Sequence, residues 1–242
     1  MEKDLVSRLC IAIPIINELD NIKVLIPKIQ DLFSNALILI IDDGSTDGSR
    51  EYVDNLILRG SNILALNRDR RSGIGSAHLL AIEFAQSQKF EYLITMDGDQ
   101  THSPLDAYQM LEKIEVYDLI IGSRYLKSSR IQGWSWFRFL LTYGSHFVTK
   151  LFFQSDLDMS SGLRCYKIRS IPLSSLQKSC PPNYDFFFVS SLVIIQSKLR
   201  IGQLPVTLID RQLGKSKMNP RLMLSGILKL LAYGLRIRKI RL

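Results

Sequence analysis

Cysteine, long apolar runs and clustered histidines are scarce in this 242-residue sequence, and each shortage argues against a class of protein. Its three cysteines are odd in number and far apart, which disfavours a disulfide framework and a four-cysteine zinc site. No uninterrupted apolar stretch reaches the roughly 18 residues that a membrane-spanning helix needs. The three histidines, His78, His102 and His146, lack the spacing of metal ligands. We therefore expect a chain from a reducing compartment that does not cross a bilayer.

The overall composition is that of a globular protein, with 46% apolar and 22% charged residues. The opening stretch carries mixed charge and resembles no signal peptide, so we expect the mature chain to begin there. The formal net charge of +8 predicts an anionic partner. Nucleic acid, anionic lipid and phosphorylated small molecules all fit that charge.

The first half of the chain alternates short β-rich apolar runs with longer helical patterns. This alternation predicts an α/β fold, a single domain with a mostly parallel central sheet. The expected strands cover residues 9–16, 36–43, 62–68 and 92–99, and the expected helices 19–33, 46–58, 75–88 and 103–117. A further strand at 118–125, an aromatic helix within 131–153, and two strands at 160–168 and 201–211 flanking a helix at 185–198 complete the pattern. Ligands of such sheets bind beyond the carboxyl ends of the strands.

We predict that the domain covers residues 1–218 and that residues 219–242 form a basic amphipathic helix. Four leucines of this segment share one helical face, and basic residues lie to its side or opposite. The leucines are Leu224, Leu228, Leu231 and Leu235, and the basic residues are Lys229, Arg236 and Lys239. Such a helix lies on an anionic membrane surface or packs on its own domain or a second subunit. The basic run at the end slightly favours the membrane.

The stretch "DGD" places Asp97 and Asp99 at the end of the run "YLIT". Side chains two apart on a strand point the same way, and two neighbouring carboxylates repel unless a cation lies between them. We therefore expect the two acids to bind Mg2+ or Mn2+, with His102 behind them. For Asp43 and Asp47, taken alone, turn and cap chemistry is the favoured explanation. Gly73 permits close approach of a phosphate, but its glycine pattern is incomplete.

Five basic residues suit phosphate oxygens if they converge, although their spacing does not establish that they do. They are Arg124, Arg138, Arg211, Lys215 and Lys217.

Taken together, these stretches resemble family 2 glycosyltransferases with a GT-A fold, in particular the branch of dolichol-phosphate mannose synthases and polyprenyl-phosphate glycosyltransferases. The stretches "IPIINELDNI", "IIDDGSTDGS", "GIGSAH", "MDGDQTHSP", "IGSRY", "SSGLRCYK" and "LIDRQLGKSK" follow the family's order over most of residues 10–217. Two departures from the family pattern concern Ile16, where an aromatic usually flanks the nucleobase, and "FFFV" at 186–189, which lacks a Gln and a Glu.

The resemblance implies a role for each of several groups of residues. The implied donor-binding residues are Pro14, Glu18, Asp42, Asp43, Gly73, Asp97 and Gly98. The implied metal site consists of Asp97, Asp99 and Thr101, completed by Gln100 or water. Arg124, Arg138 and Thr142 would hold the acceptor phosphate, Arg211 would bridge to the donor phosphates, and Lys215 and Lys217 would bind further phosphate. The catalytic set is then Asp99, Arg124, Arg138 and Arg211, and the helix at 134–153 would lie at the membrane.

The activity implied is inverting transfer of a mannose- or glucose-type hexose from a GDP- or UDP-linked donor to polyprenyl or dolichyl phosphate. Such an enzyme would be cytoplasmic and peripheral on the cytoplasmic face of a membrane, alone, as a homo-oligomer or with an anchoring subunit. Two alternatives stay open: transfer to a sugar hydroxyl with Asp185 as base, and a nonenzymatic anion-binding module. The acids at the strand ends argue against nucleic acid as the partner.

Overall fold

The computed structural model describes residues 6–211 and 213, and its centre is a seven-stranded sheet with the strand order β3-β2-β1-β4-β7-β5-β8. Strand β7 runs antiparallel to its neighbours β4 and β5, whereas the other pairs are parallel. The strands are β1 (Leu9–Ile15), β2 (Leu37–Asp42), β3 (Ile63–Asn67), β4 (Tyr92–Thr95), β5 (Leu119–Ser123), β7 (Arg164–Lys167) and β8 (Ile201–Pro205). The predicted α/β class with a mostly parallel sheet is thus confirmed.

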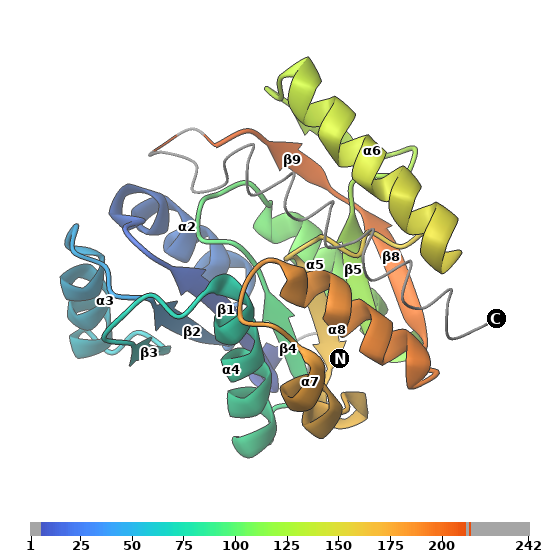
Figure 1. Ribbon diagram of the computed structural model, residues 1–242. Helices are drawn as coiled ribbons and strands as arrows, with labels where there is room; N and C mark the ends of the chain where they lie inside the picture. Colours follow the sequence, from blue (N-terminus) through green and yellow to red (C-terminus); the bar gives the residue numbers. More distant parts are fainter. Residues whose placement is uncertain (1–5, 212, 214–242) are drawn as a thin grey trace.

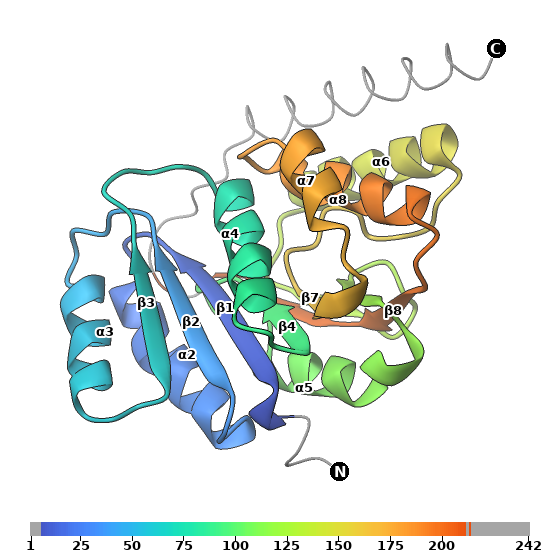
Figure 2. The ribbon, with the colours of Figure 1, turned by 90° about the horizontal axis from the view of Figure 1, so that it is seen from below.

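Helices cover both faces of this sheet, with α2, α3 and α5 on one face and α4, α7 and α8 on the other (Figures 1 and 2). The helices are α2 (Leu19–Leu32), α3 (Ser49–Leu58), α4 (Ile74–Ser87), α5 (Pro104–Lys113), α6 (Trp136–Phe153), α7 (Leu173–Ser179) and α8 (Asp185–Gln196), with 3-10 turns η1 (Ile114–Val116) and η2 (Ile168–Ser170). Helix α7 had no counterpart in the sequence pattern, because it is short and follows a proline.

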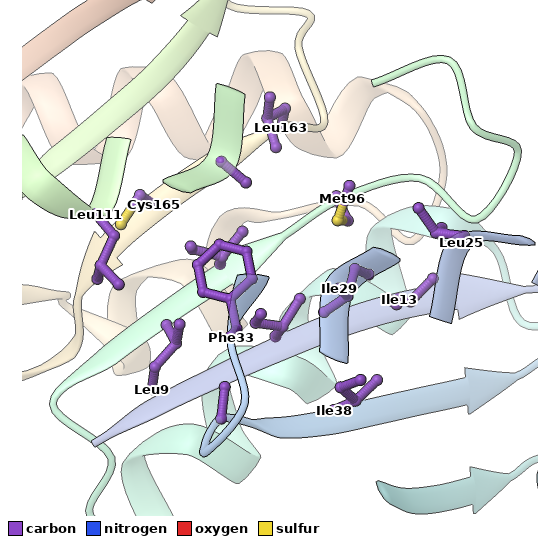
Figure 3. Packing of buried hydrophobic residues seen from close by; sticks show 14 of the residues in the cluster. Leu9, Ile13, Leu25, Ile29, Phe33, Ile38, Met96, Leu111, Leu163 and Cys165 are labelled. Atoms are coloured by element: carbon purple, nitrogen blue, oxygen red, sulfur yellow. The ribbon is translucent and has the colours of Figure 1, made fainter. Parts of the chain in front are cut away.

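Two apolar layers result from the alternation of side chains along the buried strands. In β1, Leu9, Ile11 and Ile13 point to the α2 and α5 face, whereas Cys10 and Ala12 point to the α4 face. Figure 3 shows the first layer, in which Leu25 and Ile29 of α2 lie against β1 and β2. Because both faces are covered, the strands read as nearly continuous apolar runs.

A second sheet of two strands, β6 (Arg130–Gln132) and β9 (Thr207–Ile209), differs from the sequence prediction. The expected single strand at 201–211 is split at Val206, so that β8 pairs with β5 while β9 pairs with β6. The valine backbone serves both partners, since its carbonyl accepts from Arg130 and its N–H donates to Ser123. This turn carries the chain towards Asp210 and Arg211.

The strand order reverses beside β1, because β2 and β3 extend the sheet on one side and β4 continues it on the other. The carboxyl ends of β1 and β4 are therefore neighbours, which is where open α/β sheets bind ligands. Glu18 follows the first of these ends and Asp97 the second. The predicted helix at 219–242 and its boundary at residue 218 lie outside the described residues, and the domain division stays a prediction.

Candidate functional site

Asp97, Gly98 and Asp99 form a tight turn directly after β4. The strand ends at Thr95, so strand alternation is the wrong reason for the convergence of the two acids, which the turn itself produces. Gly98 fits against the end of β1, where a Cβ would lie only 2.9 Å from Ile15 Cγ2. From the other side Gly162 covers Asp97, since a Cβ there would lie 3.1 Å from Asp97 Oδ1.

The electrostatics of this turn are those of two neighbouring carboxylates that repel each other. Burial and the negative charge of Asp99 raise the pKa of Asp97 to about 7, and the positive charge of Arg124 partly offsets this rise. His102 Nδ1 lies 3.5 Å from Asp97 Oδ2, as expected for a residue behind the acids. Burial lowers the pKa of His102 to about 4, so its imidazole is neutral near pH 7 and does not neutralise the pair.

Arg211 brings a positive charge to the same turn from the end of β9. Its guanidinium forms an ion pair with buried Glu18 and lies 4.0 Å from Asp99 Oδ2. Asn21 fixes Glu18 by a 2.7 Å hydrogen bond, and Gln100 donates to Asn21 in turn. Two distant segments, residues 18–21 and Arg211, thus converge on the loop that carries the acids.

Thr101 faces the small sheet rather than only the acids. Its N–H donates to Asp99 Oδ1 at 3.1 Å, and its carbonyl accepts from Ile209 at 3.3 Å. Among the described residues, no three His, Cys, Asp or Glu side chains lie close enough to enclose a metal ion. Any cation at this turn would therefore take its remaining ligands from Thr101 or Gln100, from water or from a substrate.

The other acids of the edge are engaged in local contacts. Asp42 accepts from the Ser45 backbone and hydroxyl and from Arg50 Nε at 3.1 Å. Asp43 forms a buried ion pair with Arg68. The cap interpretation of Asp47 is confirmed, because its carboxylate accepts from the N–H groups of Leu19 and Ser49 at the starts of α2 and α3.

Gly73 and Pro14 occupy different positions at this edge. Gly73 begins α4 with φ of +95°, and a Cβ there would lie 2.4 Å from the Pro182 carbonyl oxygen. The close approach that this glycine permits is therefore to the chain itself. Pro14 is half-buried near the end of β1 and pairs in register with Ile41.

Two of the three predicted arginines meet at a single indole ring. The Arg138 guanidinium lies 4.0 Å from the centre of the Trp134 ring, and that of Arg124 lies 6.0 Å from it. Arg124 Nε donates to Asp158 Oδ2 at 2.8 Å, and Arg138 Nη1 to Asp210 Oδ1 at 2.6 Å. The convergence that the sequence left open is thus present for Arg124 and Arg138.

Thr142 is a buried residue of α6 that contacts Tyr125, the residue after Arg124. Its carbonyl accepts from the Tyr125 hydroxyl at 3.2 Å and from Ser145 at 2.8 Å. The side chain is buried, and its contact with an acceptor phosphate stays a prediction. Lys215 and Lys217 lie outside the described residues.

Sequence reasoning missed Trp134, Asp158 and Arg164. Asp158 is fully buried and also accepts from Ser160, so it fixes Arg124 rigidly. Arg164 is fully buried too, and donates only to carbonyl and hydroxyl oxygens, from Ser161, Met159, Phe187, Ser190 and Ser191. It ties the loop at 159–162, which covers Asp97, to α8. Buried partners distant in the sequence leave no local signal, although "GWSW" marks an unusual aromatic turn.

The two departures from the family pattern have clear structural settings. Phe186, Phe187, Phe188 and Val189 are all buried in the layer between α8 and the sheet, so residues 186–189 serve packing. Asp185 is the first residue of α8 and is only partly buried. Ile16 directly follows β1.

Helix α6 carries a stripe of exposed apolar side chains, which we call the α6 stripe. It consists of Trp136, Phe137, Leu140, Tyr143, Phe147 and Leu151. The spacing keeps them on one side of the helix, which lies at the margin of the molecule (Figure 1). None of the described helices is long and apolar enough to span a membrane.

Solved structures with the same fold are GT-A glycosyltransferases. The chain superposes on glucosyl-3-phosphoglycerate synthase from Mycobacterium tuberculosis, in complex with Mn2+, UDP and glucosyl-3-phosphoglycerate, with a TM-score of 0.65 and 18% identity. The match covers 97% of this chain and 84% of that one. The same enzyme with Mg2+ and UDP gives a TM-score of 0.66, 17% identity and coverages of 97% and 83%.

The family follows from the sequence itself: residues 10–171 match the glycosyl transferase family 2 domain, and the chain belongs to that family. It is 24% identical to the undecaprenyl-phosphate mannosyltransferase of Micrococcus luteus, with 96% of each chain covered. It is 26% identical to the polyprenol monophosphomannose synthase of Mycolicibacterium smegmatis over 96% of this chain and 89% of that one. The expected family and glycosyltransferase activity are confirmed, and the nonenzymatic binding module is wrong.

Proposed function

We propose that the enzyme transfers a hexose, with inversion, from a GDP- or UDP-linked donor to polyprenyl or dolichyl phosphate at a membrane surface. Two relatives that match over nearly the whole chain are named for mannosyl transfer to such lipids. The observation that carries the proposal is that Arg124, which shares the Trp134 ring with Arg138, lies close enough to the acids to act on the pKa of Asp97. One end suits a nucleotide diphosphate with its cation and the other a phosphate nucleophile.

Asp97 and Asp99 fit a divalent cation at the donor end. Mg2+ in phosphate-transfer sites commonly takes one or two carboxylates and completes its shell with water and substrate phosphates. The raised pKa of Asp97 records the repulsion that such a cation would relieve. Bound there, Mg2+ or Mn2+ would act as a Lewis acid that stabilises the departing diphosphate. The neighbours crystallised with Mn2+ or Mg2+ and UDP support this assignment.

Arg211 would hold the donor phosphates beside the acids. Its ion pair with Glu18 keeps the guanidinium at the turn, and its Nη1 already lies 4.0 Å from Asp99. Glu18, Pro14 and Gly98 then form the donor wall where β1 and β4 end. Asp42 and Asp43 would contribute through the loop that they hold in place, with Arg50 and Arg68 as counter-ions.

Arg124 and Arg138 would receive the acceptor phosphate, with Trp134 beneath them and Thr142 nearby. A phosphate monoester has a second pKa of about 6 and is therefore already an ionised nucleophile at neutral pH. It needs no strong base, but it must be brought to an anionic donor. The two guanidinium groups would screen this repulsion and aim one oxygen at the anomeric carbon. In-line attack from this side inverts that carbon.

The α6 stripe would place this acceptor site at a lipid surface. Arg138 lies on the same helix as the stripe, so a phosphate held there would have its lipid tail beside exposed apolar side chains. The net charge of +8 favours an anionic surface. We place the enzyme on the cytoplasmic face, alone or with an anchoring subunit or second copy.

Product analysis tests the proposal directly. Purified enzyme is incubated with Mg2+ or Mn2+, GDP- and UDP-hexoses and short polyprenyl phosphates, and the glycolipid is identified by mass and anomeric configuration. A polyprenyl phosphohexose of inverted configuration is expected. Transfer only to sugar hydroxyls would instead favour Asp185 as a base, and then Asp185→Asn should lower turnover by more than about 10^3.

A further inference from the structure

The counter-ion of Arg138 differs in kind from that of Arg124. Asp158, which holds Arg124, has no exposed side-chain surface, whereas the Asp210 side chain is 41% exposed and that of Arg138 is 35% exposed. A buried carboxylate cannot leave its arginine without a large desolvation cost, but an exposed one can exchange with another anion. The pair Arg138–Asp210 is therefore the replaceable one.

The backbone places the Asp210 carboxylate at this position. Its N–H donates to the Gln132 carbonyl at 2.9 Å, which extends the pairing of β6 with β9 by one residue. Gly133 makes room for it, because φ there is +82° and a Cβ would lie 2.9 Å from Asp210 Cβ. The backbone hydrogen bond to Gln132 and the space left by Gly133 are both part of the fold, and together they hold the Asp210 carboxylate next to Arg138.

The carboxylate competes for a group that the acceptor phosphate needs. Arg138 Nη1 donates to Asp210 Oδ1 at 2.6 Å, and the same guanidinium lies 4.0 Å from the centre of the Trp134 ring. The guanidinium has further N–H donors in its plane, but a phosphate that uses them would lie beside the Asp210 carboxylate and be repelled by it. An incoming phosphate would have to share Arg138 with Asp210 or displace it.

Resting on the proposed function, we infer that Asp210 is an internal counter-ion that competes with the acceptor phosphate for Arg138. A phosphate monoester carries nearly two negative charges at pH 7.5 and is repelled by the Asp210 carboxylate, whereas a phosphodiester carries a single charge and is repelled less. Asp210 thereby weakens the binding of every anion at Arg138, and that of the dianion at least as much as that of a monoanion. It is a positioning residue that acts through Arg138 and does not touch the reacting atoms.

The test compares Asp210→Asn with Asp156→Asn in the full-length enzyme. The second variant is a matched control, because Asp156 pairs at 2.6 Å with Lys150, which lies on α6 as Arg138 does. Both side chains of this pair are well exposed, and the substitution removes the same charge. Binding of citronellyl phosphate and of its monoanionic methyl ester is measured by calorimetry at pH 7.5. Initial rates with citronellyl phosphate give KM and kcat separately.

Asp210→Asn should bind citronellyl phosphate about three- to tenfold more tightly than wild type and lower its KM by a similar factor, with little change in kcat. The methyl ester, which carries one negative charge, should gain no more than the monoester does. Asp156→Asn should match wild type. Weaker binding in Asp210→Asn, or equal gains in both variants, would overturn the inference while transfer by the wild type leaves the proposed function standing. Tighter binding by Asp210→Asn together with no transfer by the wild type would support the inference about Asp210 and overturn the proposed function.

Discussion

The two ends that we propose for donor and acceptor carry clusters of opposite charge, acids at the donor end and arginines at the acceptor end. At the donor end, acids lie where β1, β2 and β4 end, and most of them have partners within the protein. Asp42 accepts from Ser45 and pairs with Arg50, and Asp43 pairs with Arg68. Only the pair after β4 keeps its repulsion, which the pKa of Asp97 near 7 records. A charge that the fold leaves unneutralised is the one available to a ligand.

At the acceptor end the charges are positive and each is already paired. Asp158 secures Arg124 from within the protein, and Asp210 meets Arg138 at the surface. A cation bound at the proposed donor end would therefore add stability, whereas a phosphate at the proposed acceptor end would have to exchange with an anion that is already bound there. The burial of the partner therefore decides whether an arginine here is fixed in place or can exchange its counter-ion.

The largest expected effect separates the two acceptor arginines. Arg124→Ala leaves the fully buried Asp158 without its guanidinium, and should lower the free energy of unfolding by about 3–5 kcal/mol. Arg138→Ala breaks a partly exposed pair and should cost less than about 1 kcal/mol, yet it should lower turnover about 10^2-fold. Urea unfolding and initial rates measure both. Equal losses of stability would show that burial does not distinguish the pairs.

At the donor end, Asp99→Ala should lower turnover about 10^2-fold or more, because a carboxylate that would hold the cation is lost. Its stability should not fall, since the change relieves repulsion on Asp97. Asp47→Asn is the matched control, because it weakens two helix starts and should cost about 1 kcal/mol with normal turnover. Rates across a Mg2+ titration and urea unfolding separate the two outcomes, and normal rates in Asp99→Ala would remove the acids from the mechanism.

This contrast also marks what the sequence could and could not predict. Strands β1 to β5, helices α2 to α5 and the acids after β4 follow from local patterns. So does the start of α5, where the Ser103 side chain accepts from the Leu105 N–H before a helix that begins with proline. Burial on both sides of the sheet gives continuous apolar runs that need no partner to be recognised.

Partners that lie far apart in the chain could not be predicted. Arg124 meets Asp158 across 34 residues, and Arg138 meets Asp210 across 72. Neither acid stands out in sequence, and buried Arg164 resembles a surface arginine until α8 is seen to cover it. The antiparallel β7 and the split of β8 from β9 likewise depend on which strands become neighbours, which periodicity does not encode.

A smaller expected effect concerns the pH dependence of stability, which the histidines at the two ends should influence to different extents. His78, beneath the donor end, is fully buried between Phe186 and Phe187, and burial and the charge of Arg164 lower its pKa to about 3 from 6.5. The unfolded chain therefore takes up this proton first, so the contribution is present above pH 6.5 and is lost as pH falls towards 3. At pH 5 the loss is about 2 kcal/mol, to which His102 adds its own share.

Urea unfolding gives the free energy of unfolding at pH 7.5 and at pH 5. In His78→Leu this free energy should fall less between the two pH values than in wild type, by about 2 kcal/mol. His146→Gln is the control at the acceptor end, where the imidazole is half-buried and stacked on Tyr125, and the change should be smaller. An unaltered pH dependence in His78→Leu would contradict the account.

The smallest effect concerns the surface that only the acceptor end exposes. Phe147 of the α6 stripe is 66% exposed, and inserting its ring into a lipid surface would bury apolar area worth about 1.5–3 kcal/mol. Phe147→Ser should therefore weaken sedimentation with vesicles containing phosphatidylglycerol by about tenfold, and leave transfer to water-soluble citronellyl phosphate intact. Leu58 of α3, on the donor side of the molecule, is 84% exposed, and Leu58→Ser should change neither quantity (Figure 1).

If both serine variants bind vesicles like wild type, the helix does not meet the membrane and the two ends do not differ in this respect. If both lose binding equally, contact is a property of the whole basic surface. Loss confined to Phe147→Ser would assign the lipid surface to the end that holds Arg138.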